Sequence, residues 1–294
     1  MTTVQVSEKR RVWLKILGGG LVLWLLSALV TYLTANVILV PTLVLLGSFL
    51  VPVSFVAWAY ERRSSGAITA ELLFTTFVVG GLLGVLAASL VESYLLRPSP
   101  LMFLGVGFIE EAVKLAALAV CTRHLVGRST RAGVVLGATL GFGFAAFESA
   151  GYALATTFTI HGISLVDLVS TELLRGVLTP FGHGLWTGIL GGVLFSAGTR
   201  DRFRVTGRLV VAFIGVSLLH GLWDSMDSLA VVATYVFAGE SWQYRLLELG
   251  YIPAPTPDQV QTFALASWLG RIVISVAGVL WLVRVLRGRA AADV

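Results

Sequence analysis

The sequence predicts an all-α fold, a polytopic bundle of about eight helices that cross a membrane. Of the 294 residues, 56% are apolar and only 13% are charged. A soluble domain carries about a quarter of charged residues, so this chain has too few polar side chains to cover a surface in water. The apolar residues form long runs, and basic residues gather between alternate runs. These three observations indicate one integral-membrane domain over residues 1–294.

Eight segments contain the roughly 20 mostly apolar residues that a membrane-spanning helix requires. In chain order they are Ile16–Ala35, Val37–Ala59, Thr69–Glu92, Leu101–Val120, Ala132–Thr156, Val177–Ala197, Leu209–Val236 and Thr262–Val283. No small-residue cleavage site follows the first run, so we expect a retained helix rather than a removed signal peptide. The first two segments meet near Asn36 and should form a tight hairpin.

The basic residues predict the orientation. The loops on the side of the N-terminus contain 16 of the 21 Lys and Arg residues, namely Lys9, Arg10, Arg11, Lys15, Arg62, Arg63, Arg123, Arg128, Arg131, Arg200, Arg202, Arg204, Arg208, Arg284, Arg287 and Arg289. The opposite loops hold Arg97 and Arg245, with Arg175 near a boundary. Because basic loops stay in the cytoplasm, we expect a multi-pass protein of the cytoplasmic membrane with both termini inside.

The net charge and the cysteine count exclude several classes of function. The formal charge of +5 is accounted for by the basic loops of a membrane protein, so no nucleic-acid partner is expected. The single cysteine, Cys121, excludes an intramolecular disulfide and a cysteine-based zinc cluster.

Two segments on the outer side are more than simple connections. In His161–Gly176, the residues Asp167, Thr171 and Arg175 recur every fourth position among Leu and Val, which predicts a helix lying on the outer surface. Gly239–Gln261 contains aromatic residues and the sequence "IPAPTP", and is predicted to be an ordered lid or a plain loop.

Ionisable residues inside the predicted spans are concentrated in four consecutive helices. They are Glu110, Glu111 and Lys114 in "GFIEEAVKLAAL", Glu148 in the next span, His183 in the third, and His220 and Asp224 in the fourth. A rise of 1.5 Å per residue places them at a common depth, from the middle of the membrane toward its outer side. Charged groups at this depth are costly and usually mark a functional site. Residues 101–227 are therefore predicted to form a four-helix catalytic core.

Helical spacing suggests pairs within this set. Glu110 and Lys114 are four residues apart and can pair, whereas Glu111 points about 100° away. We therefore expect one carboxylate bound to Lys114 and the other facing a cavity. Asp224 is likewise one turn from His220 and would orient its imidazole. The helices of Glu148 and His183 are rich in glycine, which allows membrane helices to approach closely.

The candidate side chains are those needed to hydrolyse a peptide bond. A carboxylate beside a buried cation and other carboxylates can accept a proton from water, and imidazoles can donate hydrogen bonds to an oxyanion. No serine or cysteine lies in the context of a covalent nucleophile. His183, His220 and Glu148 would also suit a divalent metal such as zinc, although there is no His-Glu-x-x-His motif. The residues alone leave glutamate and metal open as the activator of water.

The order of these motifs resembles the PrsW family of intramembrane proteases. "EEAVK" at Glu110–Lys114 matches Glu-Glu-x-x-Lys, Phe144 and Glu148 match Phe-x-x-x-Glu, and His183 and His220 follow in the next two spans. The likeness covers about Leu101 to Asp227. More distantly, it is similar to the CAAX prenyl endopeptidases with their bacteriocin-processing relatives and to APH-1-type subunits of gamma-secretase.

The resemblance implies an endopeptidase that cuts a membrane-anchored protein such as an anti-sigma factor, in a first, site-1-type cleavage. It implies catalytic roles for Glu110, Glu111, Glu148, His183 and His220, with Lys114 and Asp224 in support. Glu148 stands where CAAX-type relatives carry histidine, and Lys114 comes one residue before their arginine, so no prenylated substrate is expected. The family has been described both as metallo- and as glutamic-type. Two alternatives remain at this point, a proton- or ion-coupled transporter and a non-catalytic scaffold.

Overall fold

The structure is a computed structural model that describes residues 11–63, 67–197 and 202–288. Four of the basic residues used to predict the orientation, Lys9, Arg10, Arg200 and Arg289, lie outside these ranges. The main helices are α1 (Val12–Thr34), α2 (Val40–Glu61), α3 (Ala70–Thr75), α4 (Gly81–Leu95), α5 (Met102–Cys121), α6 (Thr130–Thr157), α7 (Leu165–Leu178), α8 (His183–Ala197), α9 (Gly207–Asp224), α10 (Met226–Ala238), α11 (Ser241–Glu248) and α12 (Pro257–Arg287). The short elements are η1 (Val37–Leu39), η2 (Thr76–Gly80), η3 (Thr179–Phe181), β1 (Phe158–Thr159) and β2 (Gly162–Ile163).

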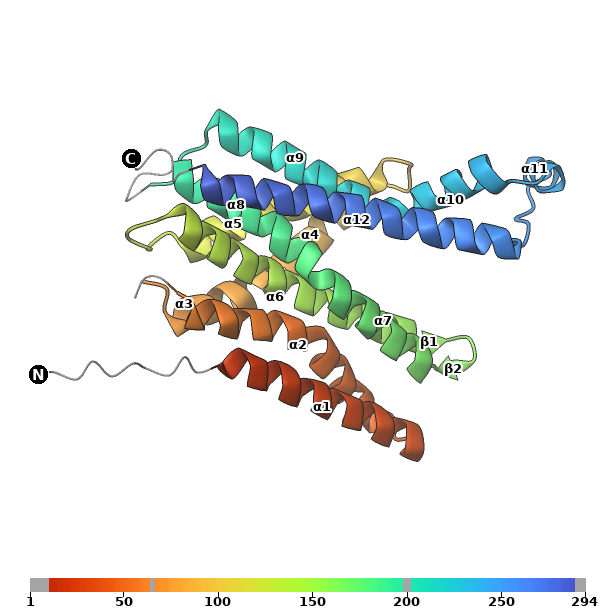
Figure 1. Cartoon of the computed structure of the whole chain (residues 1–294), viewed down its shortest axis with the longest axis horizontal. Coiled ribbons are helices and arrows are strands. Elements are labelled where there is room, and N and C mark those ends of the chain that lie inside the picture. Colours follow the sequence, from red (N-terminus) through yellow and green to blue (C-terminus); the bar gives the residue numbers. More distant parts are fainter. Residues whose placement is uncertain (1–10, 64–66, 198–201, 289–294) are drawn as a thin grey trace, which may run out of the picture.

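The all-α membrane fold predicted from composition is confirmed. Seven helical segments of the described chain are long and apolar enough to cross a membrane. They are α1, η1 with α2, α3 through α4, α6, α7 through α8, α9 and α12. The one predicted span that is not among these seven, Leu101–Val120, corresponds to α5. This helix is 20 residues long but contains three charged residues. The described chain begins with α1 and ends with α12 at the same end of the bundle (Figure 1).

The α6 helix forms the centre of the bundle. In its most apolar stretch 78% of the residues are buried, compared with 11% in α1 and in α12. The outer helices therefore turn most of their side chains toward the surroundings, as lipid-facing helices do. The α1–α2 hairpin predicted near Asn36 is present, and the Asn36 side chain accepts a hydrogen bond from the amide of Ile38. The α2 helix of this hairpin packs against α6.

Glycine permits the most extensive contact between two helices, which is that of α6 with α8. A Cβ atom at Gly133 would meet the carbonyl of Gly191, and one at Gly141 would meet the carbonyl of His183. The two backbones are thus in direct contact, and the stacking fixes where α8 begins. Since His183 is the first residue of α8, the glycines of α6 determine the position of this predicted site residue.

We expect Gly141→Ala to destabilise the protein by about 1–3 kcal/mol, because the added methyl group has to push the α8 backbone away. Gly151→Ala is the matched control on the same helix, since a Cβ there has no heavy atom within 4 Å. Thermal unfolding in detergent measures the difference. Equal unfolding temperatures for the two variants would show that α6 and α8 are not in the close contact described.

The segment predicted to lie on the outer surface differs in the structure. α7 continues through η3 into α8 as one helical segment over Leu165–Ala197, and the two helices run on in nearly the same direction (Figure 1). It packs against α2 and α6, and its Glu172 is buried, with the indole of Trp24 donating a 2.6 Å hydrogen bond. The prediction took the polar residues of one face as a sign of water, but Thr171 and Arg175 of that face turn toward α6, and only Asp167 among these three is exposed.

The segment Gly239–Gln261 is ordered around α11. Gln243 and Gln259 are buried, and their side-chain amides exchange two hydrogen bonds of 2.9 and 2.6 Å. This pair ties α11 to the first turn of α12. The predicted span Leu209–Val236 is divided into α9 and α10 at Ser225.

Candidate active site

The predicted site residues come together in one cluster between α5, α6, α8 and α9. Glu110 and Glu111 lie on α5, Glu148 on α6, His183 at the start of α8 and His220 on α9. Glu111 and His220 are fully or almost fully buried, and Glu110 is 5% exposed. The four helices therefore bring these side chains into one cluster.

Lys114 connects three members of the cluster. Its ammonium lies 2.7 Å from Glu110 Oε2, 3.1 Å from Glu111 Oε1 and 2.8 Å from His183 Nδ1. It also lies 3.9 Å from the ring centroid of Phe144. Both carboxylates of the pair are thus bound to the same cation, which reduces the cost of burying them.

The two glutamates differ in what they face. Glu110 lines a cavity, whereas Glu111 is fully buried behind it. Glu111 Oε2 accepts a 3.3 Å hydrogen bond from the hydroxyl of Thr187, and its Oε1 lies 3.0 Å from His220 Nδ1. The sequence had assigned the contact with Lys114 and the contact with the cavity to different glutamates. Glu110 makes both, because Lys114 reaches between the two carboxylates.

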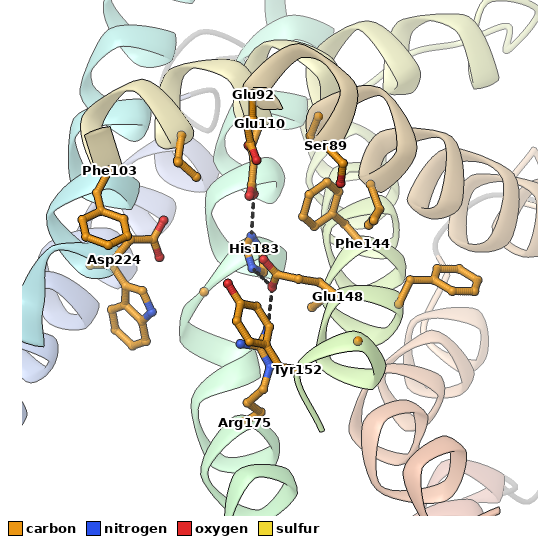
Figure 2. A pocket seen from close by; sticks show the side chains of 18 of the residues that line it. Ser89, Glu92, Phe103, Glu110, Phe144, Glu148, Tyr152, Arg175, His183 and Asp224 are labelled. Atoms are coloured by element: carbon orange, nitrogen blue, oxygen red, sulfur yellow. Dashed lines mark hydrogen bonds and ion pairs between the residues drawn. The ribbon is translucent and has the colours of Figure 1, made fainter. Parts of the chain in front are cut away.

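His183 has a defined tautomer in this arrangement. The Lys114 ammonium has only protons to donate, so His183 Nδ1 accepts. The proton of the neutral ring is then on Nε2, which lies 3.0 Å from Glu148 Oε2 and donates to it. Figure 2 shows Glu110, His183, Glu148 and Arg175 in one row, joined by these polar contacts.

Arg175 was not among the predicted site residues. Its guanidinium forms an ion pair with Glu148, donates a 2.7 Å hydrogen bond to Ser149 Oγ and lies 4.5 Å from the ring centroid of Tyr152. Arg175 thus holds Glu148 from the side opposite to His183. The sequence showed an arginine near a membrane boundary, but gave no sign that α7 turns it inward.

Arg175→Ala should reduce the rate of catalysis about 10–100-fold, the usual effect of removing a side chain that orients a site residue. The KM should change little, because Arg175 acts through Glu148. Arg175→Lys should recover part of kcat, whereas a purely structural role predicts loss of folded protein instead. Kinetics of the two variants alongside their unfolding temperatures separate these outcomes.

His220 is enclosed by carboxylates. Its Nε2 lies 3.4 Å from Asp224 Oδ2 and 3.6 Å from Glu110 Oε2. Neither ring nitrogen has a partner aligned for a hydrogen bond. The ring stands edge to face with His183, with 5.0 Å between the centroids. The predicted contact with Asp224 is present, and the imidazole faces the same Glu110 oxygen as His183 does.

The cluster forms one wall of a cavity of about 950 Å³. Glu110, Glu148, His183 and Asp224 line it, together with side chains from α4, α7 and the loop between α4 and α5 (Figure 2). A cavity of this volume accommodates several residues of an extended peptide, since it is at the upper end of the range for ligand pockets. The polar groups are therefore accessible to a substrate as well as buried in the bundle.

Three residues of the cluster have the chemistry and spacing of metal ligands. Glu110, His183 and His220 each offer one atom, and all three atoms lie within 4.8 Å of one another. Glu110 Oε2 is 3.6 Å from His183 Nδ1 and 3.6 Å from His220 Nε2. Donors around a tetrahedral zinc ion are about 3.4 Å apart, and two histidines with one glutamate form a common catalytic set. The residues therefore fit a divalent metal, with Glu110 in the place for which the sequence suggested Glu148.

Comparisons with known proteins agree with these observations. The profile of a family described as "PrsW family intramembrane metalloprotease" matches residues 68–247, more than half of the chain. The chain is also 27% identical over 173 residues to a protein named Protease PrsW from Halalkalibacterium halodurans, covering 57% of this chain and 75% of that protein. No solved structure was found to match. The chain belongs to the PrsW family and is an intramembrane protease.

Proposed function

We propose that this protease hydrolyses a peptide bond of a membrane-anchored protein, with Glu110 at the attacking water. The observation that carries the proposal is that Glu110 lines the cavity while its neighbour Glu111 is buried behind it. A water molecule in the cavity can donate a hydrogen bond to Glu110 and transfer its proton to this carboxylate as it attacks the carbonyl carbon.

The other residues of the cluster position and stabilise the reacting groups. His183 lines the cavity, and its Nε2 N–H donates to Glu148 while Lys114 donates to its Nδ1. With substrate bound, this N–H would turn from Glu148 to the oxyanion and donate to it. Glu111 has the different task of holding Lys114 and His220 behind the cavity wall. The proton taken up by Glu110 would then be returned to the leaving amine.

A metal is compatible with this arrangement. Glu110, His183 and His220 would hold it through one donor atom each, which leaves the second Glu110 oxygen to accept the proton of the water. When bound, the metal would polarise the scissile carbonyl and lower the pKa of a water ligand. The Lys114 ammonium contacts Glu110 and His183, two of these three residues. In the metal-bound protein Lys114 would therefore be left with Glu111 as its main partner.

The order of the membrane crossings suggests from which side of the membrane the substrate approaches. The cavity extends to Arg97 and Pro98 in the loop between α4 and α5, and three membrane crossings separate this loop from the N-terminus. The basic loops lie on the opposite side, so we infer a protein of the cytoplasmic membrane with its termini inside and its cavity open to the outer side. This agrees with a first, site-1-type cleavage of an anti-sigma-factor-like protein.

The test uses the purified chain in proteoliposomes with a single-span reporter protein. We expect cleavage products at a defined position by mass spectrometry; a metal held by Glu110, His183 and His220 would in addition make cleavage sensitive to chelation and restorable by zinc. Metal content provides a second readout, because His220→Ala should bind less metal per chain than the wild type. Cleavage that survives complete metal removal would assign the chemistry to the carboxylates alone, and absence of cleavage under all conditions would contradict the proposed reaction.

A further inference from the structure

One face of α4 lines the catalytic cavity. Val85, Ala88, Ser89, Glu92 and Ser93 lie along it at helical spacing, and Leu96 follows directly after the helix. Most of these side chains are small, so this wall leaves room for a bulky group of the substrate. Glu92 is the only ionisable residue on the face, and Figure 2 shows it at the same cavity as Glu110 and His183.

Glu92 differs from the other carboxylates of the cavity in having no cationic partner among the described residues. Each of the others faces a basic side chain: Glu110 faces Lys114, Glu148 faces Arg175, Asp224 faces His220, and Asp227 faces Arg271. The Oε1 atom of Glu92 is buried and lacks any hydrogen bond. Glu92 itself is half-buried, so its Oε1 is withdrawn from water while the side chain remains accessible from the cavity. A cation or a donor that reaches this oxygen would be bound favourably.

The charge of the cavity favours a cation over a neutral donor. Five carboxylates and three guanidinium groups line it, an excess of two negative charges with the imidazoles neutral. Arg97, the basic residue nearest to Glu92 in the sequence, lies in the loop after α4 and donates instead to the backbone carbonyls of Ser93 and Leu96. No basic side chain of the described residues lies within ion-pair distance of Glu92, so this carboxyl group is available to a cation from outside the chain.

We propose that Glu92 determines specificity by binding the ammonium or guanidinium group of a Lys or Arg residue close to the scissile bond. The inference rests on the proposed proteolysis and names a feature of its substrate. The apolar stem of such a side chain would lie against Val85 and Ala88 while its charged end reaches Glu92, as long basic side chains do at membrane depth.

The test compares reporter substrates that differ at one position. Lys, Met and Glu are placed in turn at each residue within a few positions of the cleavage site. At one of these positions the wild type should cleave the Lys substrate about tenfold faster than the Met substrate, because a charge-assisted contact is worth at least this much. Glu92→Gln should remove this preference, and Glu92→Lys should turn it toward the Glu substrate.

The matched control is Glu71→Gln, which removes the same charge from the other end of the α3–α4 segment, where Glu71 is exposed and outside the cavity. It should retain the wild-type preference. If the wild type cleaves all substrates equally, or if Glu92→Gln keeps the preference for Lys, the inference is wrong. If Glu92→Gln slows every substrate by the same factor, Glu92 transfers protons and does not select the substrate. Failure of the wild type to cleave any reporter contradicts the proposed proteolysis itself.

Discussion

Glu110→Gln should lower kcat at least 100-fold, within the range of about 10²–10⁴ that a positioned proton acceptor contributes. The amide keeps the size of the side chain and can still accept the hydrogen bond from Lys114, but it cannot take a proton from water. The folded yield and unfolding temperature should therefore stay near those of the wild type. Single-turnover cleavage of the reporter protein measures the chemical step separately from substrate binding.

Glu111→Gln is the informative comparison, because it makes the same substitution at the adjacent residue. Glu111 is fully buried and holds Lys114, Thr187 and His220, so its loss should reduce stability more than Glu110→Gln does and reduce kcat less. If Glu111→Gln is inactive while fully folded, and Glu110→Gln still cleaves, then the roles assigned to the two glutamates are reversed.

Lys114→Met should destabilise the protein by about 3–5 kcal/mol, the usual effect of removing one partner of a buried ion pair. Lys114 is fully buried and contacts both glutamates and His183. Without it two buried carboxylates face each other without a cation between them. Unfolding in detergent, followed by heat or by denaturant, measures the loss.

A double variant tests the physical reason for this effect. Glu111→Gln in the Lys114→Met background removes one of the two uncompensated charges and should recover part of the lost stability. Non-additivity of this kind is expected for residues of one ion-pair network. If the double variant is as unstable as the sum of the single variants, the cost comes from packing around Phe144 and not from charge.

Two residues of the cavity, Arg175 and Glu92, could not be predicted from the sequence. Arg175 is three residues after Glu172, and on helical spacing alone these two would pair on the surface of α7. In the structure Glu172 accepts from Trp24 of α1, and Arg175 turns to Glu148 of α6. Glu92 was included as the last residue of a predicted span, and nothing in its neighbours along the chain indicates that α4 presents it to the catalytic cavity.

The sequence by itself determined the class of fold and the set of polar residues. The length of an apolar run and the cost of burying a charge depend only on neighbouring residues in the sequence. Apolar runs therefore predict helices in a membrane, and the ionisable residues inside them can be identified, namely Glu110, Lys114, His183 and His220. Spacing also predicts contacts within one helix, such as that between His220 and Asp224. These inferences need only the 1.5 Å rise and 100° turn of an α-helix.

Only the tertiary structure decided how the helices are rotated against one another. That rotation depends on side-chain packing between distant segments, such as the direct contact of Gly141 with the α8 backbone, and it has no local signal in the sequence. It places Glu110 at the cavity and Glu111 behind it and brings Arg175 to Glu148. It also leaves Glu92 without a cationic partner in the described part of the chain. The sequence therefore identified the chemical groups, whereas packing between helices assigned each group its neighbours.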